Sequence, residues 1–221
     1  MNKFVWQSIF RLPFLFLKRM LLIGKTYDTM IAVVKNQRGW GMVVQLVKPD
    51  RKYLPSVYEA VAEYQAAPSK FGIHIVQKMV AAAENDFADY FQNVADEEAG
   101  IGLKPGYVTH TVYWLVDDNQ YIGSFALRHA LTPSLENIGG HIAYEIRPSR
   151  RRQGYASKGL SLCLNEARKR GIKKALVTCN AENIASYGVM RRAMATYGGF
   201  EDSEYKKDSL IEKRVWINTE K

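Results

Sequence analysis

The sequence predicts an α/β protein in which helices flank a mixed, mostly antiparallel sheet. Three observations support this fold class: apolar residues at helical spacing in 53–66, two alternating segments around an Asp-Asp-Asn turn at 117–119, and a strand, glycine turn, helix and strand in order at 139–179. The chain of 221 residues suits one domain with an appendage, and its 47% hydrophobic content is enough for a core.

The appendage is an N-terminal basic and apolar extension at residues 1–41, ahead of a domain at 43–217. Its apolar stretch at 4–23 is interrupted by Arg11 and Pro13, so it fits neither a membrane-spanning helix nor a signal peptide. Three interpretations stay open. The extension is disordered, makes weak contact with a membrane surface as a basic helix, or is not part of the native protein.

The first half of the domain is expected to form one strand followed by helices. The strand lies at 43–48, and the first helix lies at 53–66, where Pro55 is tolerated in the first turn. Residues 75–91 have the composition of one or two further helices.

A hairpin is expected in the middle of the domain. Residues 111–116 alternate and are rich in β-branched and aromatic side chains, residues 117–119 supply the turn, and residues 121–129 return. Residues 131–137 are expected to form a loop.

Strands and helices alternate in the last part of the domain. A strand at 139–146 leads to a helix at 157–170, followed by a strand at 174–179, a helix at 184–197 and a strand at 213–217. The first of these helices has one apolar stripe, formed by Leu160, Cys163, Leu164 and Ala167.

The turn from Arg147 to Ala156 has the features of an anion-binding loop. The helix that follows offers free backbone N–H groups and the positive end of its dipole. Gly154 allows close approach of a phosphate, and the arginines add charge-assisted hydrogen bonds. The alternative is a solvated basic loop that only begins a helix. The turn lacks the Gly-x4-Gly-Lys-Ser/Thr and Gly-x-Gly-x-x-Gly patterns of nucleotide-binding loops.

Arg151-x-x-Gly154-x-Ala156 resembles the coenzyme-binding signature of the GNAT superfamily of N-acetyltransferases. A second motif is similar as well: Asn183 precedes a helix that ends at Gly198-Gly199-Phe200. The resemblance covers 43–217. It implies the GNAT acyl-CoA N-acyltransferase fold, in which a splayed pair of strands opens a slot for the pantetheine arm.

The resemblance also implies acetyl-CoA as the acetyl donor, held by the loop amides, and it implies no metal. Asn183 has a structural alternative, because it is also a good helix N-cap. The residues implied for the coenzyme are Ile146, Arg147, Arg151, Arg152, Gln153, Gly154, Tyr155, Ala156, Ser157, Asn183 and Ser186.

In the family, an amine attacks the thioester carbonyl directly. His141 and Glu145 lie on one face of the strand before the loop and are the candidate bases, although a structural role stays open for each. Many family members carry a tyrosine acid seven residues after the motif asparagine, but this chain has Met190 there. Either a solvent proton serves, or a nearby tyrosine substitutes; Tyr187 is the candidate, and Tyr197 is the other tyrosine close to this position.

The expected function is transfer of an acetyl group from acetyl-CoA to a primary amine. The amine belongs to a small molecule, an amino acid, an aminoglycoside-like compound or a protein N-terminus. The alternative is a non-catalytic coenzyme A-binding or regulatory module similar to GNAT proteins. Similar proteins are often homodimers.

Charge and cysteine content narrow the class of partner and the compartment. Of the net charge of +9, the seven basic residues and one acidic residue of 1–41 account for +6. The rest of the chain is therefore only mildly basic, which gives little support for a nucleic-acid-binding surface. Cys163 and Cys179 suit a reducing cytoplasm, and the cysteines and histidines show no metal-ligand spacing.

Overall fold

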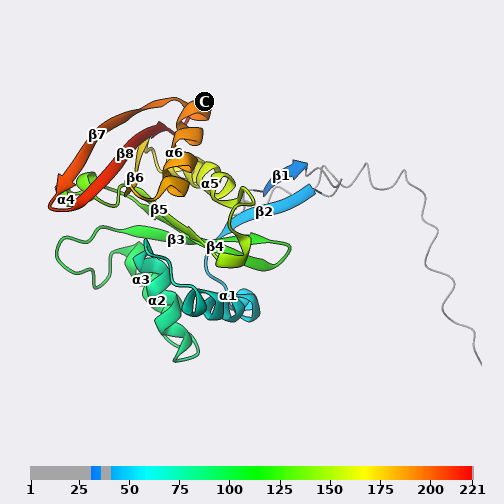
Figure 1. The fold of residues 1–221 in the computed structure, drawn as a ribbon. Coiled ribbons are helices and arrows are strands. Elements are labelled where there is room, and N and C mark those ends of the chain that lie inside the picture. The colour runs from blue at the N-terminus through cyan, green and yellow to red at the C-terminus, as the bar shows by residue number, and fades with distance from the viewer. Residues whose placement is uncertain (1–30, 36–40, 221) are drawn as a thin grey trace, which may run out of the picture.

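The computed structural model describes residues 31–35 and 41–220, which form two antiparallel sheets and flanking helices (Figure 1). The strands are β1 Ile31–Lys35, β2 Gly41–Val47, β3 His110–Asp117, β4 Gln120–Arg128, β5 Ile142–Ile146, β6 Lys174–Asn180, β7 Gly199–Lys207 and β8 Leu210–Asn218. The helices are α1 Leu54–Ala66, α2 His74–Ala83, α3 Tyr90–Ala99, α4 Pro133–Asn137, α5 Tyr155–Lys169 and α6 Ile184–Tyr197.

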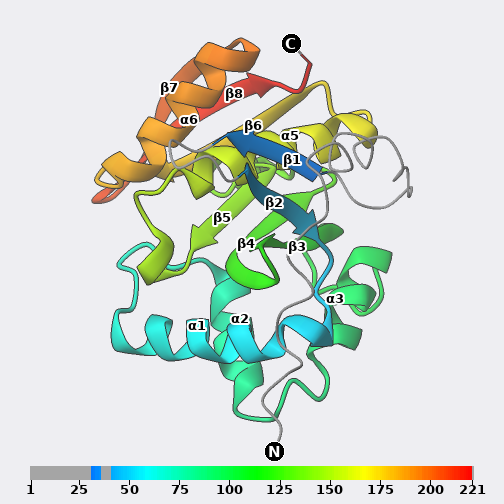
Figure 2. The ribbon, with the colours of Figure 1, turned by 90° about the vertical axis from the view of Figure 1, so that its right-hand side faces the viewer.

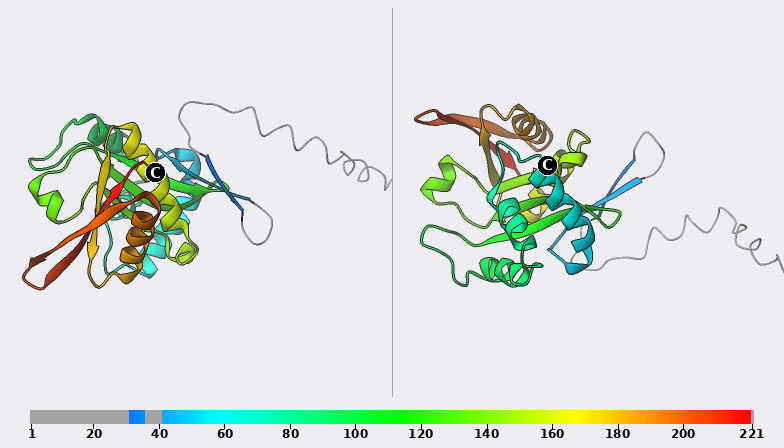
Figure 3. Two further views of the ribbon diagram at one scale, coloured as in Figure 1. Left: turned by 90° about the horizontal axis from the view of Figure 1, so that it is seen from above. Right: turned by 60° about the horizontal axis from the view of Figure 1, so that its bottom comes forward.

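The larger sheet has the order β1-β2-β3-β4-β5, and the smaller one has the order β6-β8-β7. Helices α1, α2 and α3 cover one face of the larger sheet, and α5 covers the other, with α6 and the smaller sheet beyond it (Figure 2). The β1–β2 and β7–β8 hairpins project from opposite sides of the molecule (Figure 3).

The hydrophobic core has two parts, one on each face of the larger sheet. Strand β3 contributes to both, because its side chains alternate between the faces. Trp114 packs toward α1, α2 and α3, whereas Leu115 packs toward α5. The predicted stripe of α5 is confirmed, since Leu160, Cys163, Leu164 and Ala167 are all fully buried.

Strands β5 and β6 belong to different sheets and meet only near their beginnings. The backbone N–H of His141 donates to the Leu176 carbonyl at 2.7 Å, and the Leu176 N–H donates to Nδ1 of His141 at 3.0 Å. No strand ladder joins β5 to β6 among the described residues. This is the splayed pair that the resemblance implied.

Most of the predicted helices and strands are confirmed, with shifts of a few residues at their ends. Residues 133–137, expected as a loop, form α4, because Pro133 suits a first helical position and Thr132 caps it by accepting from the Leu135 N–H at 3.3 Å. Strand β7 was not predicted at all. It is a largely exposed edge strand without apolar alternation.

The larger sheet begins before the boundary expected at residue 43. Residues 31–35 form β1 and pair with β2, so this part of the extension is an edge strand. The expectations for 1–30 and 36–40 lie outside the described residues. No helix within residues 31–35 and 41–220 is long and apolar enough to cross a bilayer.

Candidate active site

Two cavities meet where β5 and β6 separate. The loop-side cavity has a volume of about 740 Å³ and lies between the 150–157 loop, the end of β5 and the first half of α6. The sheet-side cavity has a volume of about 630 Å³ and lies between the start of α2, β5 and the end of β6. Four residues line both cavities, namely Phe71, Tyr144, Asn183 and Ser186.

The N-terminus of α5 opens into the loop-side cavity without a side-chain cap. Gly154 holds the N-cap position at a φ of 84°, and a Cβ there would meet no atom within 4 Å. A side chain at this φ is strained, so glycine fits the turn. The first N–H groups of α5, on Tyr155, Ala156 and Ser157, are therefore available to an anion.

Four arginines line the loop-side cavity, and they differ in their partners. Arg151 pairs with Glu145 at 3.2 Å, and Arg150 donates to the side chain of Gln120. Arg152 and Arg192 have no carboxylate partner among the described residues, although Arg192 donates to Ser157 Oγ at 3.4 Å. Arg150 also has no carboxylate partner among these residues, so three of the four guanidinium groups carry a charge that suits phosphate.

Arg192 was missed by the sequence analysis. It lies on the same helical face as Ala185, Gly188 and Val189, which also line the cavity. Helical spacing alone places Arg192 on this face of α6. Its place in the site could be recognised only once this face was known to point toward the 150–157 loop.

Most of the residues implied for the coenzyme line the loop-side cavity. They are Ile146, Arg151, Arg152, Gly154, Tyr155, Ala156, Ser157, Asn183 and Ser186. Tyr155 is also a structural support, because its buried hydroxyl donates to Asp117 Oδ2 at 2.6 Å. Gln153 is not in the lining and instead donates to the Ser149 carbonyl at 3.0 Å.

Arg147 is not in this cavity, which corrects the expectation. Its guanidinium is buried on the α1 side, where it pairs with Glu63 at 2.5 Å and donates to the Tyr121 carbonyl at 3.2 Å. Its backbone N–H donates to the Ile122 carbonyl at 2.9 Å, toward β4 and away from the splay. Both its side chain and its amide are therefore already engaged.

His141 is also outside both cavities, so its geometry does not support the role of base. It is buried, and its Nδ1 accepts the Leu176 N–H, which fixes the point where β5 and β6 meet. Burial, and secondarily the charge of Arg128, lowers the pKa of His141 to about 4. The structural alternative fits this side chain.

Glu145 lines the loop-side cavity, but its carboxylate is occupied. Oε2 accepts from the Ile73 N–H at 3.1 Å, and Oε1 pairs with Arg151. The side chain holds the 69–73 segment against β5. This arrangement favours a positioning role over that of a base.

Tyr187 does not reach either cavity. Its hydroxyl donates to Glu201 Oε2 on β7 at 2.8 Å. Tyr187 therefore does not take over the role of the tyrosine that many family members carry at the position of Met190. Met190 is fully buried in the core.

Two hydroxyl groups stand at the junction of the cavities instead. The Tyr144 hydroxyl lies 2.9 Å from Ser186 Oγ, and Asn183 caps α6 by accepting from the Ser186 N–H at 3.1 Å. Burial raises the pKa of Tyr144, so its hydroxyl stays protonated at neutral pH. From the sequence, Ser186 was expected only as a coenzyme contact, and the Tyr144 side chain was not expected at the site.

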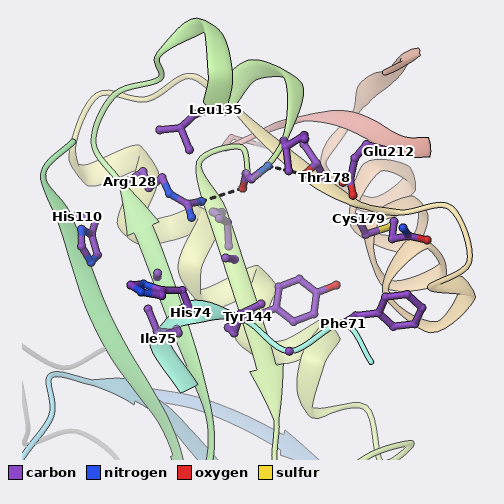
Figure 4. A pocket seen from close by; sticks show the side chains of 18 of the residues that line it. Phe71, His74, Ile75, His110, Arg128, Leu135, Tyr144, Thr178, Cys179 and Glu212 are labelled. Carbon is purple, nitrogen blue, oxygen red and sulfur yellow. Dashed lines mark hydrogen bonds between the residues drawn. The ribbon is translucent and has the colours of Figure 1, made fainter. Parts of the chain in front are cut away.

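The sheet-side cavity contains a buried carboxyl that the sequence analysis missed. Glu212 on β8 is 6% exposed and lies beside Thr178 and Cys179, opposite His110, His74 and Arg128 (Figure 4). Burial raises the pKa of Glu212 above 4.5. Val215 and Ile217 are buried, so the period of two in a strand would put Lys213, and not Glu212, on the buried face of β8. Strand periodicity therefore could not identify Glu212 as a buried residue.

Comparison with known proteins places the chain in a family. Residues 46–196 match the family model described as "Acetyltransferase (GNAT) domain". Comparison with curated protein sequences gave no match.

Solved structures show the same fold at low sequence identity. RimL, a ribosomal alpha-N-protein acetyltransferase in complex with coenzyme A, is 17% identical, with a TM-score of 0.57 over 87% of this chain and 100% of that one. Mycobacterium smegmatis RimJ, in complex with a coenzyme A disulfide, is 16% identical, with a TM-score of 0.60 over 86% and 87%. An acetyltransferase from Salmonella typhimurium that modifies the N-terminal serine of a ribosomal protein is 16% identical, with a TM-score of 0.51 over 79% and 94%.

Proposed function

This chain belongs to the GNAT acetyltransferase family and is an acetyl-CoA-dependent N-acetyltransferase; from that premise we propose that the loop-side cavity holds the coenzyme and the sheet-side cavity holds the amine. The observation that carries this proposal is that the two cavities share the Tyr144–Ser186 contact, so ligands filling both would meet there.

The residues of the loop-side cavity fit coenzyme A. The uncapped N-terminus of α5 and the side chains of Arg152 and Arg192 suit the pyrophosphate. The outer edge of β5 has no strand partner beyond His141 among the described residues, so its backbone groups suit the amides of the pantetheine arm. The thioester would then lie near Tyr144 and Ser186.

Glu212 is the proposed base. A protonated amine must lose a proton before its nitrogen attacks the thioester carbon, and the Glu212 carboxylate in the sheet-side cavity can take that proton, directly or through water. The raised pKa of Glu212 makes it a better proton acceptor than an exposed glutamate.

The Ser186 and Tyr144 hydroxyls are the proposed proton source for the leaving thiolate. The bond from the carbonyl carbon to sulfur breaks as the bond to nitrogen forms. The sulfur takes a proton from this hydroxyl pair, and the pair regains a proton from the nitrogen, which loses its second proton as the amide forms. A proton donor at this place does not require a tyrosine at position 190, which supports catalysis over the alternative of a non-catalytic module.

The α-amine of a protein N-terminus is the proposed acceptor. Two of the similar structures belong to enzymes that acetylate the N-terminus of a ribosomal protein. A cavity of about 630 Å³ has room for the first residues of a peptide.

The test measures free thiol released from acetyl-CoA with peptides that differ only in a free or a blocked α-amine. Transfer to the free amine alone is expected. The variant Glu212→Gln should lower kcat by about 100-fold while leaving coenzyme affinity unchanged. Glu201→Gln, which alters an exposed carboxyl outside both cavities, is the matched control. Equal kcat for Glu212→Gln and wild type would remove Glu212 from the mechanism.

A further inference from the structure

Arg128 is a cation without a carboxylate partner at one side of the sheet-side cavity. Its Nη1 donates to the Gly139 and Gly140 carbonyls at 2.8 and 2.9 Å, and no acidic side chain pairs with it among the described residues. Burial lowers the pKa of Arg128, which nevertheless stays charged at neutral pH. The carbonyls fix the guanidinium in place but do not neutralise it.

The other basic side chains of this cavity differ from Arg128. Lys70 pairs with Glu182, and Lys78 pairs with Glu97, which also lies 3.3 Å from His110. Burial lowers the pKa values of His74 and His110, so both are mainly neutral at pH 7. Within the part of the chain that the structure describes, Arg128 is therefore the cation of this lining that has no acidic partner, and a ligand carboxylate could balance it.

The charges of this cavity are separated in space. Figure 4 shows Arg128, His74 and His110 on one side, Glu212 on the other, and Tyr144 between them. The His74 ring has no hydrogen-bond partner among the described residues, so it is free to donate to a ligand beside Arg128.

We propose that the acceptor is a peptide N-terminus with an acidic side chain in its first few residues. This inference rests on the proposed function. The α-amine lies at Glu212, and the carboxylate pairs with Arg128 and accepts from His74. The half-buried guanidinium of Arg128 and a carboxylate form a charge-assisted pair. The distance between Arg128 and Glu212 then selects the position of the acidic residue in the peptide.

The rim of the cavity favours a peptide over a free amino acid. Tyr107 and Ile138 line the cavity and are 54% and 38% exposed, so they offer apolar contact to a chain that continues beyond the first residues. A free amino acid would leave these side chains in water.

The experiment compares, with the wild-type enzyme, peptides that carry Asp or the isosteric Asn at position 2, 3 or 4. At one position kcat/KM should be at least about tenfold higher for Asp than for Asn. In Arg128→Gln this ratio should fall to about one, because the Asp peptide loses its ion pair with Arg128, whereas the Asn peptide has no such pair to lose. Lys70→Gln, which removes a cation that already has an acid, should keep the ratio.

The outcomes separate this inference from the proposed function. Acetylation of all peptides with equal kcat/KM overturns the role of Arg128 and leaves the N-terminal acceptor standing. No acetylation of any peptide, with transfer to free glutamate or another small amine, overturns both. If Arg128→Gln fails to fold, the Asp and Asn series on the wild-type enzyme decides by itself.

Discussion

Arg147 stands in the basic run that suggested phosphate binding, yet its side chain stabilises the fold. Burial raises the pKa of Glu63, but the hydrogen bonds from Arg147 and Ser149 outweigh it and lower the pKa to about 2. Because this folded-state pKa is below the ordinary value of 4.5, the pair contributes stability above pH 4.5 and loses it as the pH falls toward 2.

Replacement of Arg147 should therefore destabilise the protein rather than weaken coenzyme binding. Arg147→Leu leaves Glu63 charged without its partner, and we expect a loss of about 3 kcal/mol in the free energy of unfolding at pH 7. Chemical denaturation measures this, and the difference from wild type should shrink below pH 4.5. Arg152→Leu, in the same run but exposed, should change stability by less than about 0.5 kcal/mol. Equal stability for Arg147→Leu and wild type would contradict the assignment.

His141 offers a second test at a single side chain. His141→Ala leaves the Leu176 N–H without its acceptor and should lower the free energy of unfolding by about 1–3 kcal/mol. His141→Asn is the matched variant, because its side-chain oxygen can accept the same hydrogen bond, and it should recover most of the loss.

The pH dependence of stability checks the same residue. The folded-state pKa of about 4 lies below the ordinary 6.5, so the unfolded chain takes up this proton first and stability falls as the pH drops from 6.5 to 4. That part of the acid sensitivity should be absent from His141→Asn. A large loss of kcat with unchanged stability would restore His141 as a catalytic candidate.

At the scale of helices and strands, local pattern predicted most of the fold. The β-branched and aromatic residues of 111–129 predicted two strands, which are buried along almost their whole length, and the apolar stripe of α5 predicted its buried face. Each of these signals lies within one continuous segment of the chain, so the sequence alone contains it. Strand β7 depends on pairing with β8 rather than on its own side chains, and no local pattern marks such an edge strand.

The packing of α5 on β4 depends on one glycine. A Cβ at Gly159 would collide with the fully buried Phe125 ring, so Gly159→Ala should destabilise the protein by about 1–3 kcal/mol. Gly188→Ala in α6 is the control, since no atom lies within 4 Å of the added Cβ, and it should stabilise the protein by up to about 1 kcal/mol. Thermal unfolding of both variants measures the contrast, and a Gly159→Ala protein as stable as Gly188→Ala would refute the close contact.

For the whole molecule, the candidate site was only partly predictable. Gly154 and Asn183 belong to motifs that are continuous in the chain, so they could be recognised. Arg192, Tyr144 and Glu212 come from three separate segments, and their importance depends on where the two sheets diverge. That divergence is a property of the assembled fold and leaves no local pattern.

Coenzyme binding should stabilise the whole molecule. Coenzyme A bound to the folded state alone would add about 2.7 kcal/mol at a hundredfold excess over its Kd, seen as a rise in Tm. Gly154→Glu puts a carboxylate and a strained φ at the anion site, so this rise should vanish. Gly171→Glu carries a similar strain at a φ of 78° beyond the other end of α5 and should keep it. Equal shifts in the two variants would argue against the loop as the phosphate site.

The wall shared by the two cavities has a consequence for inhibitor chemistry. Phe71, Tyr144, Asn183 and Ser186 would touch both ligands at once, so no protein layer separates the coenzyme sulfur from the peptide nitrogen. A single compound in which a short linker joins coenzyme A to the α-nitrogen of an acidic peptide could span both cavities. Because the second half then binds without a separate loss of translational freedom, such a bisubstrate compound should bind far more tightly than either half.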